Sequence, residues 1–245
     1  MKTMPVALGA LGALALAAAP AIANADEWPK LDEDTTDDVE ENVRWFARTK
    51  PAPSRAFELG AATGYTQGFG LARAGVEMGS IAAEGIGAEL AAGYRVDPHW
   101  SFGVAGQFYE VIPERAAGAR GLTGTLGVQY HFKPETTFDP WVELGLGYRG
   151  LWETQSPEQP AIDRQALQVA RVRLGADYRI TESVSLGPFI GLDANVFVTE
   201  NGAPVDDPRL STFVMAGMIG RFDLGGERKR TKEPDWMPDY SRAQR

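Results

Sequence analysis

The sequence predicts an all-β fold, an eight-stranded antiparallel up-and-down transmembrane β-barrel, on three observations. Apolar residues alternate with polar residues or glycine through most of residues 55–224, a secretory signal precedes this region, and short and long connections follow one another. Successive side chains of a strand point to opposite faces, so the alternation gives each strand one apolar and one polar face. A transmembrane barrel needs this arrangement, with the apolar face toward lipid and the polar face inside.

Residues 1–25 predict a cleaved signal peptide. Lys2 supplies a basic start, an apolar run extends from Pro5 to Ala19, and Ala23-Asn24-Ala25 is a small-x-small cleavage site. A single membrane helix is the alternative, but such a helix needs about 20 apolar residues and Pro20 interrupts the run. No later stretch of the sequence is suited to a membrane helix, so strands must provide any crossing.

The predicted strands and connections set the topology. The strands are 56–69, 84–96, 100–110, 121–132, 141–153, 166–180, 184–198 and 210–223. Short turns follow the second, fourth and sixth strands, and the connections 70–83, 111–120, 154–165 and 199–209 are longer. Bacterial outer-membrane barrels have short periplasmic turns and longer external loops, so we expect both termini in the periplasm.

Segments of different composition flank the barrel, which is predicted at 55–224. Residues 26–54 form an acidic periplasmic leader, either solvated or carrying a short helix from near Thr36 that docks at the barrel mouth. Residues 225–245 form a basic periplasmic tail with Trp236 and Tyr240. The tail is interpreted as disordered or as a periplasmic docking peptide.

Glycine and arginine identify the inner face. A narrow lumen needs small residues beside long ones. The alternate strand positions that carry the charged residues, here called the charged parity, are also rich in glycine. The sixth strand places Arg171, Arg173 and Arg179 on this parity. A lipid-facing arginine costs about 2–4 kcal/mol near the bilayer midplane. The alternative is a soluble lipocalin-like barrel with its apolar face inward. Because glycine and charge place the polar face inside, the apolar face points outward, where it would promote aggregation in water and is required in lipid.

The inward parity predicts a charge network in the lumen. Its members are Glu58, Glu89, Arg95, Glu143, Arg149, Arg171, Arg173, Asp177, Arg179, Asp193 and Arg221. Acids and bases nearly balance, and an eight-stranded barrel has room only for side chains, so we expect a paired ionic core. The alternative is a narrow polar conduit in which the arginines of the sixth strand attract anions.

Aromatic residues near the strand ends predict interfacial girdles. The predicted set is Tyr94, Phe102, Phe108, Tyr130, Phe132, Tyr148, Trp152, Tyr178 and Phe222.

Other function classes find little support in the sequence. The only histidines, His99 and His131, fall at or beside short turns, away from any external Ser-His site, so we predict no enzyme and no catalytic residues. Asp206-Asp207-Pro208 lacks a complete calcium-loop pattern, and the absence of cysteine excludes thiolate sites, so no metal or cofactor is expected. A net charge of −9 argues against nucleic acid as a partner.

The chain resembles the superfamily of eight-stranded outer-membrane barrels, including the OmpA transmembrane domain and OmpW-like proteins. The resemblance is carried by strands 141–148 and 186–193 and by turns 95–100 and 178–183. It implies the outer membrane of a Gram-negative bacterium, with outer-membrane lipids and the outer-membrane assembly machinery as partners. This sequence departs from the superfamily pattern in two ways. A tail follows Phe222, where such barrels often end. No peptidoglycan-binding domain like that of OmpA follows the barrel. The leader and tail are therefore the candidates for periplasmic or peptidoglycan contact.

Three functions are compatible with this architecture. The first is a structural role in envelope integrity, or surface interaction, with a lumen filled by polar side chains. The alternative is a narrow passive channel for small or amphipathic solutes, as proposed for OmpW-like barrels. The third is adhesin-like recognition through the external loops.

Overall fold

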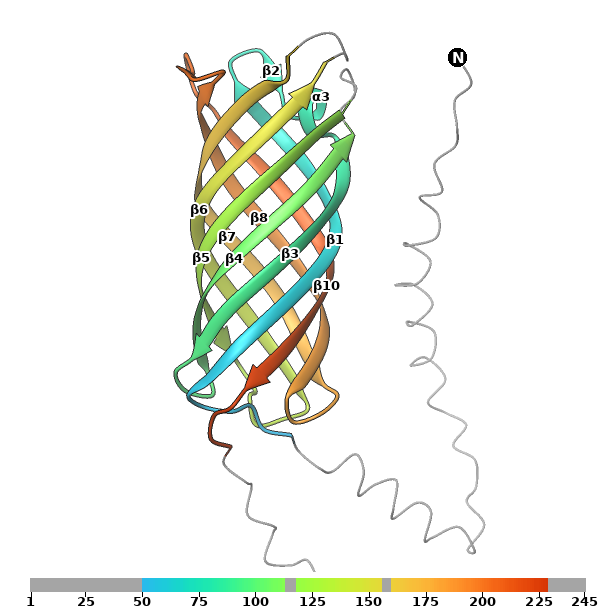
Figure 1. The fold of residues 1–245 in the computed structure, drawn as a ribbon, viewed down its shortest axis with the longest axis vertical. Helices are drawn as coiled ribbons and strands as arrows, with labels where there is room; N and C mark the ends of the chain where they lie inside the picture. Colours follow the sequence, from blue (N-terminus) through green and yellow to red (C-terminus); the bar gives the residue numbers. More distant parts are fainter. Residues whose placement is uncertain (1–49, 113–117, 156–159, 229–245) are drawn as a thin grey trace, which may run out of the picture. The chain divides into compact units, whose positions relative to one another are not determined.

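Eight long antiparallel strands close into a barrel in the computed structural model, which describes residues 50–112, 118–155 and 160–228 (Figure 1). The strands are β1 (Ala56–Arg73), β3 (Glu84–Arg95), β4 (Trp100–Ile112), β5 (Gly118–His131), β6 (Phe138–Thr154), β7 (Ile162–Arg179), β8 (Val184–Glu200) and β10 (Leu210–Leu224). Each pairs with the next in sequence, and β10 pairs with β1 to close the sheet. The predicted fold class is confirmed. No helix in the described part of the chain is long and apolar enough to cross a membrane.

Several strands are longer than predicted. β1 continues to Arg73 instead of ending at residue 69, β6 begins at Phe138 instead of 141, and β7 begins at Ile162 instead of 166. Pro140, which lies before the predicted strand, pairs with Ala176, and its carbonyl accepts a bond of 2.9 Å from the Phe132 N–H. The ends predicted at residues 96, 132 and 180 lie one residue too far, in the turns.

The two ends of the barrel differ in their connections (Figure 1). One end, the turn end, carries the turns 96–99, 132–137 and 180–183 together with the start of β1 and the end of β10. Side-chain oxygens make two of these turns compact. Asp97 accepts bonds from the His99 and Trp100 N–H groups (2.7 and 2.9 Å), and Thr181 accepts from Ser183 and Val184. The longer connections lie at the opposite end, the loop end.

The first connection at the loop end folds inward, which the sequence analysis did not anticipate. It forms β2 (Val76–Glu77) and the one-turn helix α3 (Gly79–Ala82). Met78, Ile81 and Ala82 are fully buried against inward residues of the barrel. Gly68 permits this close approach, because a Cβ at that position would lie 2.9 Å from the Ala82 carbonyl oxygen. The other short strand, β9 (Ala203–Pro204), pairs with the end of β8.

A short segment, Lys50–Ser54, lies against the turns at the turn end; we call it the clasp. The Ala52 N–H donates to the Pro134 carbonyl (2.7 Å), and Lys50 donates to the Ile180 carbonyl (2.6 Å). Ser54 and Glu227 exchange two backbone bonds of 2.8 Å, which extend the β1–β10 seam beyond the barrel. The predicted signal peptide, most of the leader with its helix, and the tail from residue 229 lie outside the described residues.

Candidate functional site

The residues of the predicted charge network all face the lumen, and none is more than 8% exposed. Five further ionisable residues of the described chain are equally buried: His131, Asp139, Glu153, Arg164 and Asp223. Asp139 and Arg164 were missed because the predicted strands began too late. Glu153 and Asp223 have the inward parity of Arg149 and Arg221, so a consistent parity count to the strand ends would have found them.

A cluster of charges occupies the middle of the lumen. Arg173 donates to one oxygen of Glu89 (2.7 Å) and to both oxygens of Glu143 (3.1 and 2.5 Å). Arg171 donates to the other Glu89 oxygen (2.5 Å) and lies 3.5 Å from Asp193, which accepts from Arg149 at 2.6 Å. These arginines come from β6 and β7, and they reach across to β3 and β8. Charge-assisted bonds of this length are among the strongest in proteins.

A chain of four side chains lies near the turn end. Arg95 donates to Glu58 (2.6 and 3.1 Å) and to Nε2 of His131 (3.0 Å), whose Nδ1 lies 2.7 Å from Asp139. A guanidinium can only donate, so Nε2 must accept and Nδ1 must carry the proton that bonds to Asp139. Both ring nitrogens of His131 are therefore engaged in structure.

Beside this chain, three further contacts lie in the turn-end half of the lumen. Arg179 donates to Asp223 at 2.7 Å. The Trp141 indole donates to Asp177 at 3.0 Å, and the Arg221 guanidinium lies 4.5 Å from the Trp141 ring centroid. This stacking combines apolar burial with a cation–π contact.

An apolar layer crosses the lumen toward the loop end. It consists of Tyr109, Leu151, Phe197 and Phe213, with Met78 and Ile81 of the inward-folded connection packed on it. All six are 2% exposed or less. The Arg149 guanidinium lies 3.8 Å from the Phe213 ring centroid, so the charge cluster borders the layer directly.

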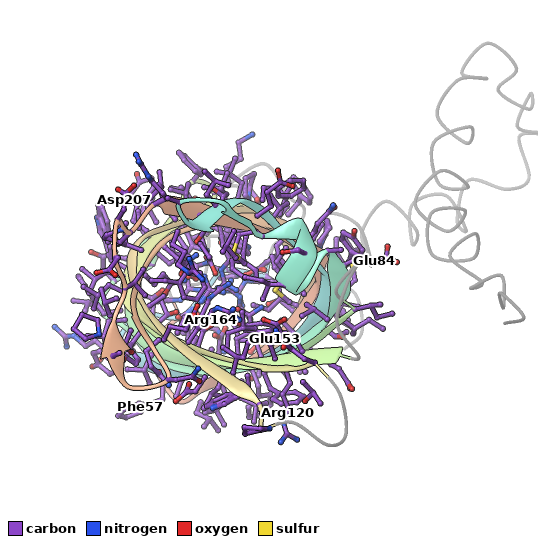
Figure 2. The ribbon with its side chains drawn as sticks, turned by 90° about the horizontal axis from the view of Figure 1, so that it is seen from above. Phe57, Glu84, Arg120, Glu153, Arg164 and Asp207 are labelled. Carbon is purple, nitrogen blue, oxygen red and sulfur yellow. The ribbon has the colours of Figure 1, made fainter. Side chains whose placement is uncertain are left out.

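A second ionic group lies beyond the apolar layer, at the loop-end mouth. Arg164 bonds to Glu153 and, at 3.0 Å, to Glu200, which lies 3.6 Å from Arg73. Figure 2 shows Arg164 and Glu153 inside the ring of strands, whereas Arg120 and Phe57 point outward.

Arginines and carboxylates nearly balance across the described lumen. The buried arginines are Arg95, Arg149, Arg164, Arg171, Arg173, Arg179 and Arg221, and the buried carboxylates are Glu58, Glu89, Asp139, Glu143, Glu153, Asp177, Asp193 and Asp223. Burying a charge is tolerated only when a partner offsets the lost hydration. The arrangement can therefore hold the barrel wall together. Within the described ranges, no group of three His, Asp or Glu side chains is placed to hold a metal ion.

The predicted interfacial aromatics lie on the outer face, seven of them exposed and Tyr130 and Trp152 partly covered. At the turn end, the Tyr130 ring packs edge-on against Trp100 (4.8 Å between centroids) and Phe132 (5.1 Å). Phe57 packs on Tyr94 in the same way at 5.2 Å. Trp100 and Phe57 belong to this group but were absent from the predicted set.

No protein-family model matches the chain, and no curated protein matches its sequence. Solved structures do match. Neisserial surface protein A is 15% identical with a TM-score of 0.50, over 68% of this chain and 96% of that one. The N-terminal β-barrel domain of OprF from Pseudomonas aeruginosa is 17% identical (TM-score 0.43, 70% and 99% covered). The outer membrane protein OprG from the same species is 14% identical (TM-score 0.45, 71% and 99%).

The first of these likenesses supports a shared fold. It agrees with the closed sheet, the polar lumen and the apolar exterior described above. The chain thus has the fold of the eight-stranded outer-membrane β-barrels.

Proposed function

We propose that the chain is an outer-membrane barrel with a structural role in the cell envelope, its lumen filled by side chains. The exterior supports a membrane location. Ile86, Leu90 and Leu126 are 60–73% exposed, and similar residues cover the outer face of every long strand. A continuous apolar surface of this kind would drive aggregation in water, whereas a bilayer requires it.

The filled lumen carries the proposal of a structural role. The turn-end chain, the central charge cluster, the apolar layer and the loop-end ionic group lie at successive levels of the same interior. A passive channel needs a continuous wet path, and the apolar layer offers water few polar partners, since its one hydroxyl, on Tyr109, already faces the Gly150 carbonyl at 3.5 Å. A filled barrel instead resembles a protein core, in which paired side chains stabilise the wall.

We propose no catalytic activity. The two ring nitrogens of His131 already have partners, and His99 stacks on Tyr130 at 5.8 Å beside the turns. A histidine that acts as a general base needs a free nitrogen within reach of a nucleophile.

Conductance in planar bilayers tests the filled lumen. Purified protein that migrates as a heat-modifiable, folded species should give no reproducible conductance steps, because the apolar layer and the ion pairs block the passage. The same bilayers should respond to a general porin added afterwards, which excludes an insensitive membrane. Reproducible steps from the folded species would overturn the structural proposal and favour the passive channel.

A further inference from the structure

The lumen wall is asymmetric around the barrel. The largest inward side chains of the central levels come from β6, β7, β8 and β10, including Arg149, Arg171, Arg173, Phe189 and Arg221. Beside them, the part of the wall that β1 to β5 contribute carries several small residues, which are Gly60, Ala91, Gly93, Gly103, Ala105 and Gly127. The long side chains do not fill this side completely. A cavity of about 60 Å³ remains, lined also by Arg221 and Gln129.

Arg221 differs from the other buried arginines in the described residues. Each of the others has a carboxylate oxygen within 2.7 Å. The nearest carboxylate to Arg221 is Asp177 at 3.6 Å, beyond a hydrogen bond. Its one short polar contact is the Gln129 carbonyl oxygen at 2.6 Å.

Two buried donors therefore lack acceptors beside the cavity. Nε of Arg221 and Nε2 of Gln129 make no hydrogen bond in the described structure, and the carboxylate oxygen nearest to Arg221 Nε is Asp177 Oδ2 at 3.6 Å. An unsatisfied buried donor costs about 1–3 kcal/mol, and more when the group is charged. Such donors in native proteins usually bond to buried water.

We propose that this cavity is a hydration site that holds a cluster of ordered water molecules bonded to Arg221 and Gln129. The volume is sufficient for about two to four waters, and the polar lining meets the requirement of several partners for each. Glu58 and Glu143 line the same cavity and offset the charges of Arg173 and Arg221, so a bound anion would gain little. Water, which both donates and accepts, fits this mixed lining. In this arrangement hydration adds to the longer ion pair that Arg221 forms with Asp177 at 3.6 Å.

An isosteric pair of substitutions at Ala105 tests the hydration site. Ala105 is an inward residue of β4 that lines the cavity. Ala105→Thr and Ala105→Val add almost the same volume and have the same branching, but only threonine can replace the hydrogen bonds of a displaced water. We expect the Thr variant to unfold at a temperature higher than the Val variant by about 3 °C or more. Equal stability, or a more stable Val variant, would overturn the proposal.

The matched control is the same pair at Ala61, which lies on the outer face of β1. There Val should be at least as stable as Thr, because the side chain faces lipid. A crystal structure of the unsubstituted protein soaked in bromide gives a second readout that does not depend on the variants folding. Water density in the cavity without an anomalous signal supports the site. An anomalous bromide peak or an empty cavity would refute it.

Discussion

Arg173 and Arg221 are both buried in the lumen, yet their surroundings stabilise them in different ways. Arg173 makes three hydrogen bonds to the carboxylates of Glu89 and Glu143, at 2.5–3.1 Å. Arg221 stacks on Trp141 and bonds only to an amide oxygen. The charge pattern in the sequence placed both on the inner face, but it could not distinguish them, because partner choice depends on how residues 30 to 92 positions apart are aligned across the barrel.

Replacing each arginine by methionine should separate these two roles. Arg173→Met leaves Glu143 without its short bonds and Glu89 with one arginine, so we expect a loss of about 3–5 kcal/mol in unfolding free energy. In Arg221→Met every lumen carboxylate keeps a hydrogen-bonded partner, so the loss of unfolding free energy should be clearly smaller. Urea unfolding in detergent, followed by tryptophan fluorescence, measures both. Similar losses for the two variants would contradict the distinction.

Between strands, the alternation predicts which face a residue occupies but not which residue lies opposite. The predicted rule of small beside large holds at particular pairs, such as Gly175 opposite Trp141 on β7 and β6. That pair follows from the register, which the alternation leaves open to any even shift. Strand ends are the other weak point. Asp139 and Arg164 lie just outside the predicted strands, where the apolar signal fades before the pairing ends.

Alanine substitution at two glycines tests the packing between β6 and β7. A Cβ at Gly175 would overlap the Trp141 ring and lie 2.9 Å from the Pro188 carbonyl oxygen, so Gly175→Ala should cost about 1–3 kcal/mol. Gly124→Ala, on the outer face with open space around it, should be neutral or stabilising by up to about 1 kcal/mol. Unfolding midpoints of the two variants provide the comparison. An equal loss at both sites would mean that backbone freedom, and not contact with Trp141, determines the effect.

At the scale of the whole molecule, the barrel and its inner face follow from the sequence, whereas the closure of its two ends does not. The connection 70–83 contains no strong helix pattern, and α3 is a single turn whose burial depends on Gly68 and on the apolar layer beneath it. The clasp is equally inaccessible to pattern analysis, since its bonds join backbone groups of Ala52 and Ser54 to distant carbonyls. Both features arise from tertiary contact, which a local pattern does not encode.

The orientation of the barrel in the membrane is the remaining prediction, with the turn end and both termini in the periplasm. Long polar connections on one side and compact turns on the other are typical of barrels inserted from the periplasm. An epitope placed between Asp206 and Asp207, which are exposed in the loop-end connection, should bind antibody on intact Gram-negative cells. The same epitope after Arg245 should bind only when the outer membrane has been permeabilised. Because the two tags differ only in position, labelling of the C-terminal tag on intact cells would reverse the assigned orientation.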